Sequence, residues 1–200
     1  MHYGNIKPFS IENGPGVRVS LFVSGCRNHC PGCFSAHTWD FAYGKEFDEA
    51  AQAQLLEELR PDYIQGLTVL GGEPMEPENQ RDLLSLLRRI RSELPGKDIW
   101  IYTGFTLTAE KGRFTLTDLG AGENQELRER ADISELQEIL TLTDVLVDGR
   151  FHEEEKDLLL AFRGSRNQRI IDLQASLQSG QIRLCEKWMS GTRMKNGERS

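Results

Sequence analysis

The chain has 200 residues, of which 38% are hydrophobic and 28% charged, and its net charge is -7. A single domain of this length buries roughly 70% of the surface of the unfolded chain, so it needs no disulfides to be stable. The 31 acidic and 24 basic side chains give an excess of negative charge that repels a phosphate backbone. This excess argues against a nucleic-acid polymer as a partner.

The N-terminal segment lacks the basic and apolar regions of a signal peptide, and no segment approaches the ~20 apolar residues of a membrane span. Three of the four cysteines fall within eight residues, too close together to staple distant parts of a fold. We therefore expect a cytoplasmic protein in a reducing compartment, with no membrane contact.

The first predicted strand begins at residue 17, where side chains alternate with period two through Ser24, and ends at Gly25 and the cysteines. A helix over 48–59 follows. A short buried strand over 67–70 then runs into the polar turn 71–74. In both cases the polar feature comes directly after the carboxyl end of a strand.

A second helix is predicted from apolar residues at helical spacing over 83–94, with Asn79 as its cap and its end before Pro95. The elements that follow are a strand over 99–102, a helix over 134–140 and a strand over 144–147. Alternating strands and helices predict an α/β fold with right-handed crossovers and a mostly parallel sheet, whose ligands gather at the carboxyl ends of the strands. The units are too few for an eight-fold barrel, which favours an open, partial barrel.

Two segments do not fit this alternation. Residues 106–131 are predicted to be an insertion, and residues 176–200 a polar tail with a frayed end. We therefore expect one domain over 1–175, interrupted by the insertion and followed by the tail.

The cysteines Cys26, Cys30 and Cys33 have the spacing C-x3-C-x2-C on one loop. Thiolates select zinc or iron-sulfur clusters, and a [4Fe-4S] cluster bound by three cysteines leaves one iron open for chemistry. Two alternatives remain at this point. One is a disulfide framework, and the other is a zinc knuckle completed by His29, His37 or Cys185.

Cys185 lies in the predicted tail, and we expect it to be an inert lone thiol. His29 lies between two of the cysteines. We expect it to be exposed or to tune the cluster by hydrogen bonding, and not to be a ligand.

Together with Gly71-Gly72-Glu73-Pro74, the cysteine loop resembles the radical S-adenosylmethionine (SAM) superfamily. Further motifs resemble the activating proteins of anaerobic ribonucleoside-triphosphate reductases, namely Asn13-Gly14-Pro15-Gly16, Phe22-Val23-Ser24-Gly25-Cys26, Cys30-Pro31-Gly32-Cys33, Thr38-Trp39-Asp40, Val147-Asp148-Gly149 and the run from Arg163 to Gln168. The resemblance covers most of residues 3–105 and 133–173.

This resemblance implies an enzyme that cleaves SAM reductively at a [4Fe-4S] cluster and generates a glycyl radical on the large subunit of the reductase. A methionine moiety offers an amine and a carboxylate, which can chelate the open iron and hold the sulfonium close to the cluster. The resemblance also implies a low-potential electron donor such as flavodoxin, and assembly as a homodimer or as a heterotetramer with the reductase.

The residues expected to bind the cofactor are Gly32, Cys33, Phe34, Gly71, Gly72, Glu73, Pro74, Thr103 and Asp148. The two glycines let the backbone approach the methionine end, and Glu73 is a candidate acceptor for its ammonium group. Thr103 and Asp148 are candidate ribose or rim contacts, although Asp148 next to a glycine is also typical of a turn. Many superfamily members have an aromatic residue at the position of Gly32, so the support for adenine must come from Phe34 or from backbone.

Other functions are compatible with the same loop. The target is either the reductase, another glycyl-radical enzyme of the formate-lyase type, or a small molecule. A non-enzymatic alternative is a zinc-stabilised binding module. Iron, sulfide and zinc analysis of the protein separates the cluster from the zinc module.

Overall fold

The computed structural model describes residues 1–117 and 133–189. The strands are β1 (His2–Ser10), β2 (Val17–Val23), β3 (Lys45–Glu46), β4 (Ile64–Gly71), β5 (Asp98–Tyr102), β6 (Thr106–Glu110), β7 (Arg113–Thr117), β8 (Val145–Asp148) and β9 (Arg169–Asp172). The α-helices are α1 (Glu49–Leu59), α2 (Pro77–Glu93), α4 (Ile133–Leu142), α5 (Leu173–Ser179) and α6 (Glu186–Met189). Two short 3-10 helices are η1 (Ala36–Thr38) and η2 (Glu153–Glu155).

One open sheet forms the centre of the fold, with the strand order β3-β1-β2-β4-β5-β8-β9. The strands β2, β4, β5 and β8 pair in parallel. At the two sides of this parallel block, β1 and β9 pair antiparallel to their neighbours. The predicted α/β class with a mostly parallel, open sheet is therefore confirmed.

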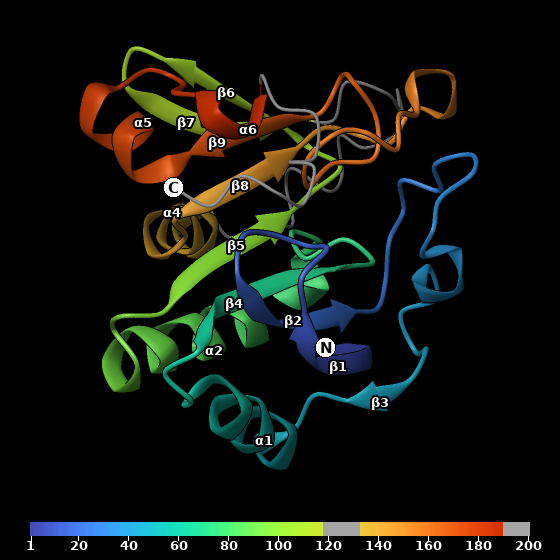
Figure 1. Cartoon of the computed structure of the whole chain (residues 1–200), viewed down its shortest axis with the longest axis vertical. Helices are drawn as coiled ribbons and strands as arrows, with labels where there is room; N and C mark the ends of the chain where they lie inside the picture. Colours follow the sequence, from blue (N-terminus) through green and yellow to red (C-terminus); the bar gives the residue numbers. More distant parts are fainter. Residues whose placement is uncertain (118–132, 190–200) are drawn as a thin grey trace, which may run out of the picture.

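The helices α1, α2 and α4 lie side by side along one face of the sheet (Figure 1). α1 begins as the sequence predicts, because the carboxylate of Asp48 caps it by accepting a hydrogen bond from the N–H of Ala51 at 2.8 Å. α2 begins earlier than predicted, with Pro77 in its first turn. The prediction that Asn79 caps this helix is wrong, since Asn79 lies inside the first turn and its amide bonds elsewhere.

The main core lies between the sheet and these helices. Alternate residues of β2, β4 and β5 point into it, and the leucines of α1 and α2 meet them there. Its fully buried members include Val19, Leu21, Val23, Leu55, Leu59, Leu67, Val69, Leu83, Leu87, Ile90, Ile99 and Ile101. Burying one side chain of this size stabilises the folded state by about 1.5–3 kcal/mol.

The opposite face of the sheet carries a buried cation. Arg18 on β2 is fully buried, and its guanidinium donates to Thr68 Oγ1 at 2.7 Å and to the carbonyl of Leu67 at 2.8 Å. It also pairs with Asp98 and lies over the ring of Trp100, 5.4 Å from its centroid. These partners satisfy a charge that would otherwise be costly to bury.

Residues from the predicted C-terminal tail cover part of this second face. The ring of Trp188 on α6 packs edge-on against Phe162 at 4.9 Å, and Phe162 packs against Trp100 at 5.7 Å. Met189 Sδ accepts from the N–H of Ile170 at 3.3 Å. The tail as far as Met189 is therefore folded onto the sheet, and its remaining residues, 190–200, lie outside the described part of the chain.

The predicted insertion begins with a separate hairpin of β6 and β7, in which Leu107 and Phe114 are buried. Its residues 118–131 lie outside the described part of the chain. None of the described helices is long and apolar enough to cross a membrane.

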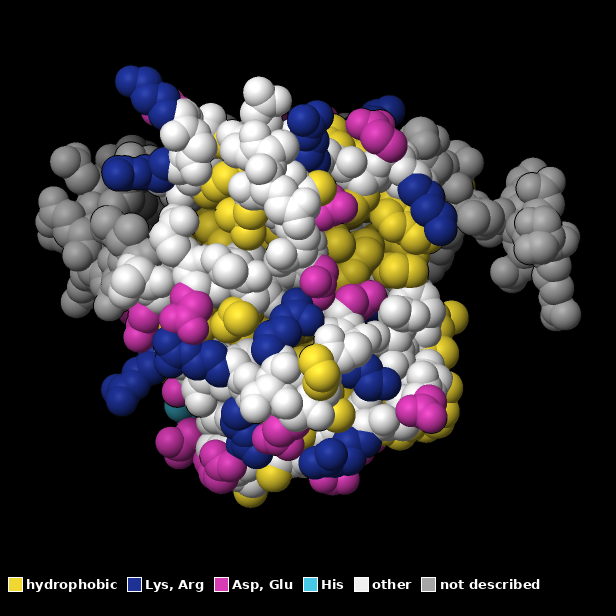
Figure 2. All heavy atoms as spheres, turned by 90° about the vertical axis from the view of Figure 1, so that its left-hand side faces the viewer, with side chains coloured by type: hydrophobic (Ala, Val, Ile, Leu, Met, Phe, Trp, Pro, Cys, Tyr) yellow, Lys and Arg dark blue, Asp and Glu magenta, His cyan; other side chains and the backbone are white. Residues whose placement is uncertain are grey.

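The surface on the side of the helices mixes both signs of charge. Figure 2 shows acidic and basic side chains intermingled there. The pair Arg88 and Glu138 joins α2 to α4, and the pair Arg89 and Glu49 joins α2 to α1. Such exposed pairs contribute little each, about 0–1 kcal/mol.

The loops that follow β2, β5 and β8 all lie at the carboxyl edge of the parallel strands, on the right in Figure 1. This is the edge where an α/β sheet presents its ligand sites. The cysteine loop after β2 therefore meets the turn after β4 and the loops after β5 and β8.

Candidate functional site

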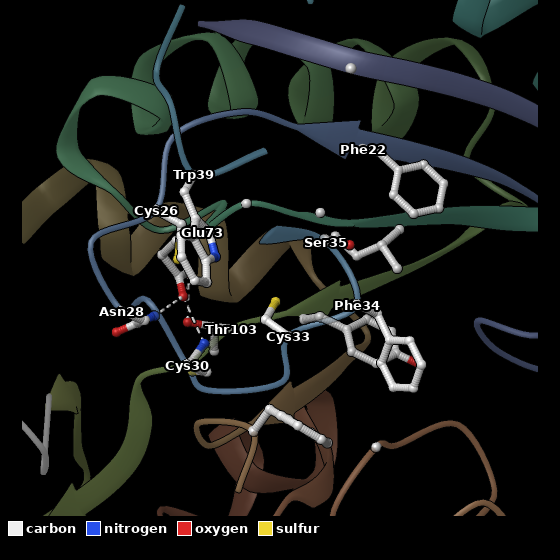
Figure 3. Close-up of a pocket in the computed structure, with 18 of the residues that line it drawn as sticks. Phe22, Cys26, Asn28, Cys30, Cys33, Phe34, Ser35, Trp39, Glu73 and Thr103 are labelled. Atoms are coloured by element: carbon white, nitrogen blue, oxygen red, sulfur yellow. Dashed lines mark hydrogen bonds between the residues drawn. The ribbon is translucent and has the colours of Figure 1, made fainter. Parts of the chain in front are cut away.

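The three cysteines of the loop line one cavity of about 760 Å³ at this edge (Figure 3). The loop is fastened at its base, where the N–H groups of Gly25 and Cys26 donate to the carbonyls of Thr38 and Trp39 at 2.8 and 3.1 Å. Between the last two ligands the chain makes a tight turn, in which the N–H of Cys33 donates to the carbonyl of Cys30 at 3.2 Å. Backbone bonds therefore fix both the entry to the loop and its tip.

All three thiols are free, so the disulfide alternative has no support. Cys26 is buried, whereas Cys30 and Cys33 are partly exposed. Burial, followed by the charge of Glu73, raises the pKa of Cys26 to about 12. Burial also raises the pKa of Cys30. Metal binding must therefore displace protons from these thiols. Three free thiols around one cavity are a donor set that fits an iron-sulfur cluster.

The zinc alternative needs a fourth ligand beside the three cysteines, and its candidates make other contacts. The ring of His29 stacks on Trp39 at 4.6 Å, and the ring of His37 packs edge-on against Tyr43 at 5.3 Å. Cys185 is half-buried next to α6, and burial raises its pKa to about 11, as expected for an inert thiol.

Glu73 connects three segments of the chain at the site. Its side chain is buried, and its two carboxylate oxygens accept four hydrogen bonds. Oε1 accepts from the N–H of Met75 at 2.9 Å and from the hydroxyl of Thr103 at 2.7 Å. Oε2 accepts from the N–H of Gly104 at 2.6 Å and from the amide of Asn28 at 3.1 Å. One carboxylate thus ties together the cysteine loop, the turn after β4 and the loop after β5, as Figure 3 shows in part.

The four donors favour the charged form of Glu73, but burial outweighs them and raises its pKa to about 7. In the unfolded chain the carboxyl loses its proton near 4.5. Protonated Glu73 therefore stabilises the folded state. This stabilisation is fully present below pH 4.5 and is lost as the pH rises through about 7.

We expect the free energy of unfolding of the metal-free protein to fall by about 3 kcal/mol over this range because of Glu73 alone. The measurement is urea unfolding of wild type and Glu73→Gln at a series of pH values. The difference between the two proteins isolates Glu73, since all other carboxyls cancel. A difference that does not change with pH would contradict the raised pKa.

Gly71 and Gly72 bring the end of β4 against the end of β2. Gly71 has a φ of +107°, which L side chains rarely adopt. The N–H of Gly72 donates to the carbonyl of Val23 at 2.7 Å, and the N–H of Glu73 donates to the carbonyl of Gly25 at 2.8 Å. The side-chain amide of Asn79 donates to the carbonyls of Ser24 and Glu73, at 3.0 Å each, and so also holds these two segments together.

The predicted cofactor-binding residues do not all come together. Those that line the cavity are Cys33, Phe34, Gly71, Gly72, Glu73 and Thr103. Gly32, Pro74 and Asp148 are not among its lining residues. Asp148 is buried, pairs with Arg169 through an Nε–Oδ1 bond of 2.9 Å, and accepts from the N–H of Leu107 at 2.7 Å. Its carboxylate therefore joins β8 to β9 and to the hairpin.

Phe34 lies at the mouth of the cavity, where it is 68% exposed. Its ring packs edge-on against Phe151 at 6.1 Å, and the ammonium of Lys156 lies 4.9 Å from its centroid. An added Cβ on Gly32 would lie 2.8 Å from the carboxylate of Glu153. The aromatic surface next to the cysteines thus comes from Phe34 and Phe151 in place of a side chain at position 32.

Sequence reasoning missed Asn28, Tyr102 and Gln168, which also line the cavity. Asn28 lies inside the cysteine motif, and Gln168 ends the run from Arg163. Membership of these two motifs is the signal in the sequence that points to both residues. Gln168 accepts from the N–H of Gly164 at 2.8 Å and donates to the carbonyl of Gly149 at 3.0 Å. It therefore fastens two lining segments to each other.

Comparison with known proteins agrees with this geometry. Residues 12–171 match the family model of a 4Fe-4S single cluster domain. The anaerobic ribonucleoside-triphosphate reductase-activating protein of Escherichia coli (strain K12) is 40% identical over 170 residues, which span 84% of this chain and 96% of that protein. The protein of the same name from Pasteurella multocida (strain Pm70) is 40% identical over 170 residues, 84% of this chain and 95% of the relative.

A phage protein extends the comparison. The anaerobic ribonucleoside-triphosphate reductase-activating protein of Enterobacteria phage T4 is 35% identical over 170 residues, 85% of this chain and 93% of the relative. The residues that match the family model include the cysteine loop and the parallel strands β2, β4, β5 and β8. The chain belongs to the family of anaerobic ribonucleoside-triphosphate reductase-activating proteins, with a 4Fe-4S single cluster domain.

Proposed function

We propose that Cys26, Cys30 and Cys33 hold a [4Fe-4S] cluster at which this chain cleaves SAM reductively, and that it thereby generates a glycyl radical on the large subunit of an anaerobic ribonucleoside-triphosphate reductase. The observation that supports the proposal is the meeting of three free thiols on one cavity, in a chain 40% identical to activating proteins of this reductase. The electron comes from a low-potential donor such as flavodoxin. The working assembly is a homodimer, or a heterotetramer with the reductase.

A [4Fe-4S] cluster held by Cys26, Cys30 and Cys33 would supply the electron for the reductive cleavage of SAM, from which hydrogen abstraction at the target would follow. The residues of the chain position and enclose this chemistry. Glu73 holds the cysteine loop against the loop after β5. The glycines at 71 and 72 let the end of β4 pack against the end of β2, at the base of the cysteine loop. The ring of Phe34 offers an apolar surface to adenine.

We assign the reaction to a radical SAM domain over residues 1–175, with the insertion 106–131 and the tail 176–200 outside the catalytic unit. The cavity is open at the edge where Phe34 is exposed. A carbon radical must be kept from water while it reacts. A protein substrate seated on this edge meets that need better than a small molecule does, which favours a macromolecular target.

The test is to incubate the reduced, cluster-loaded protein anaerobically with SAM and the reductase large subunit, and to record electron paramagnetic resonance spectra. We expect a doublet glycyl signal on the reductase that requires SAM. A reductase variant with alanine in place of the glycine that carries the radical should give no doublet. This variant is the control for signals from other radicals.

The alternatives give different results. A doublet on a formate-lyase type partner with none on the reductase would mean a different glycyl-radical target. A modified small molecule without any protein radical would overturn the activase proposal. One zinc per chain with no sulfide would favour the binding module, since a [4Fe-4S] cluster requires about four iron and four sulfide per chain.

A further inference from the structure

Arg27, the residue directly after Cys26, is held by hydrogen bonds to two carboxylates. Its backbone N–H donates to Glu76 Oε1 at 2.8 Å, and its guanidinium Nη1 donates to Glu76 Oε2 at 2.6 Å. The same guanidinium donates to both oxygens of Glu78, at 3.0 and 2.5 Å. Two carboxylates at the start of α2 therefore bind Arg27, which lies between Cys26 and Cys30.

The far side of the guanidinium is covered as well. Its Cζ atom lies 4.4 Å from the ring centroid of Phe41, which follows the cysteine loop. Arg27 thus connects three places: the loop, the start of α2 and the segment after the loop. We call Arg27, Glu76, Glu78 and Phe41 the clamp.

The paired charges of Arg27 and Glu76 differ in their exposure. The side chain of Glu76 is 1% exposed and that of Arg27 is 35% exposed. A charge buried away from water acts through a low dielectric and is poorly screened, whereas an exposed one is damped. Glu76 accepts a hydrogen bond from the backbone N–H of Arg27 at 2.8 Å, so its buried carboxylate lies against the residue that directly follows the ligand Cys26.

We propose that Arg27 is a positioning residue for the cysteine loop, and that Arg27 and Glu76 shift the reduction potential of the cluster in opposite directions. Reduction adds one negative charge to the cluster. A nearby cation stabilises that charge and a nearby buried anion opposes it, and net local charge is one of the terms that set such potentials. The inference rests on the proposed function, because it assumes that the loop holds a cluster.

The expected shifts follow from these charges. Arg27→Gln removes the cation and leaves the buried carboxylate of Glu76, so the potential becomes more negative. Glu76→Gln removes the anion and keeps an oxygen acceptor for the backbone of Arg27, so the potential becomes more positive. The second shift is the larger, because Glu76 is buried. Arg27→Lys keeps the charge but loses the fork of donors, so the potential stays near that of wild type while a chelator removes the iron faster.

The experiment is a potentiometric titration of the reconstituted full-length protein, followed by electron paramagnetic resonance of the reduced cluster, without SAM or partner. Arg88→Gln is the matched control, since it removes an equal charge from an exposed residue of α2. Arg88 lies about 15 Å further along the helix than Glu78. The reduction potential of the cluster in Arg88→Gln should equal that of wild type.

Shifts of opposite sign for Arg27→Gln and Glu76→Gln support the inference, because a merely structural defect has no reason to change sign with charge. Shifts of the same sign, or no shift in either variant, would overturn it. If Glu76→Gln takes up no cluster, the test is the comparison of Arg27→Gln with Arg27→Lys. Equal reduction potentials for these two variants would overturn the inference. A wild-type protein without iron and sulfide would instead refute the proposed function itself.

Discussion

Replacing Cys26, Cys30 or Cys33 with alanine is expected to abolish the cluster and SAM cleavage together. A cluster that already has only three protein thiolates should tolerate no further loss. Iron and sulfide should fall from about four of each per chain towards zero after anaerobic reconstitution. Quantifying 5'-deoxyadenosine in the presence of a chemical reductant measures the cleavage.

The control is Cys185→Ala, which should keep both the iron and the cleavage activity. The thiol of Cys185 is half-buried in the small cluster of Trp100, Phe162 and Trp188, apart from the cavity. Loss of iron in this variant, together with a full active cluster in any of the three loop variants, would show that the ligands are assigned to the wrong cysteines.

Gly72→Ala is expected to disrupt the site as strongly as the loss of a ligand. A Cβ atom at position 72 would lie 2.6 Å from the carbonyl oxygen and 3.1 Å from the nitrogen of Gly25, the residue before Cys26. These are backbone atoms, fixed by the bonds between the ends of β2 and β4, so neither side can give way cheaply. We expect the free energy of unfolding to fall by about 3 kcal/mol and most chains to lose the cluster.

Gly96→Ala is the matched control for this variant. No atom lies within 4 Å of a Cβ at Gly96, so the same methyl group enters open space there. Thermal unfolding of the two metal-free proteins and the iron content after reconstitution make the comparison. A Gly72→Ala protein with the stability and iron content of wild type would mean that the strand ends are not packed as closely as the structure has them.

Much of the fold could be predicted from the sequence, because its signals are local. The alternation that begins at residue 17 predicts β2, which ends at Val23, two residues before the predicted end. The helix predicted over 48–59 is α1, which Asp48 caps. The antiparallel strands β1 and β9 were not predicted. Their pairing depends on partners distant in the chain, and the sequence alone does not say that β1 pairs antiparallel with β2 or that β9 pairs antiparallel with β8.

The site divides in the same way. The cysteine spacing and the glycines after β4 are local, and the structure brings both to one cavity. The surroundings of Asp148 and Glu73 are not local. Antiparallel pairing sets Asp148 opposite Arg169, and the donors to Glu73 come from three segments of the chain. A carboxylate at the end of a strand gives no sign in the sequence of whether it will face a ligand or a partner in the protein.

The junction at Glu73 also has a thermodynamic consequence. The cysteine loop and the loop after β5 are ordered by bonds to one and the same carboxylate, so whatever orders the first loop reduces the entropy that the second must still lose. Such coupling is reciprocal: two ligands that each order one of these loops raise each other's affinity by the same factor. A metal centre held by the cysteines and a molecule held by the loop after β5 would thus behave as a cooperative pair, each retained better in the presence of the other.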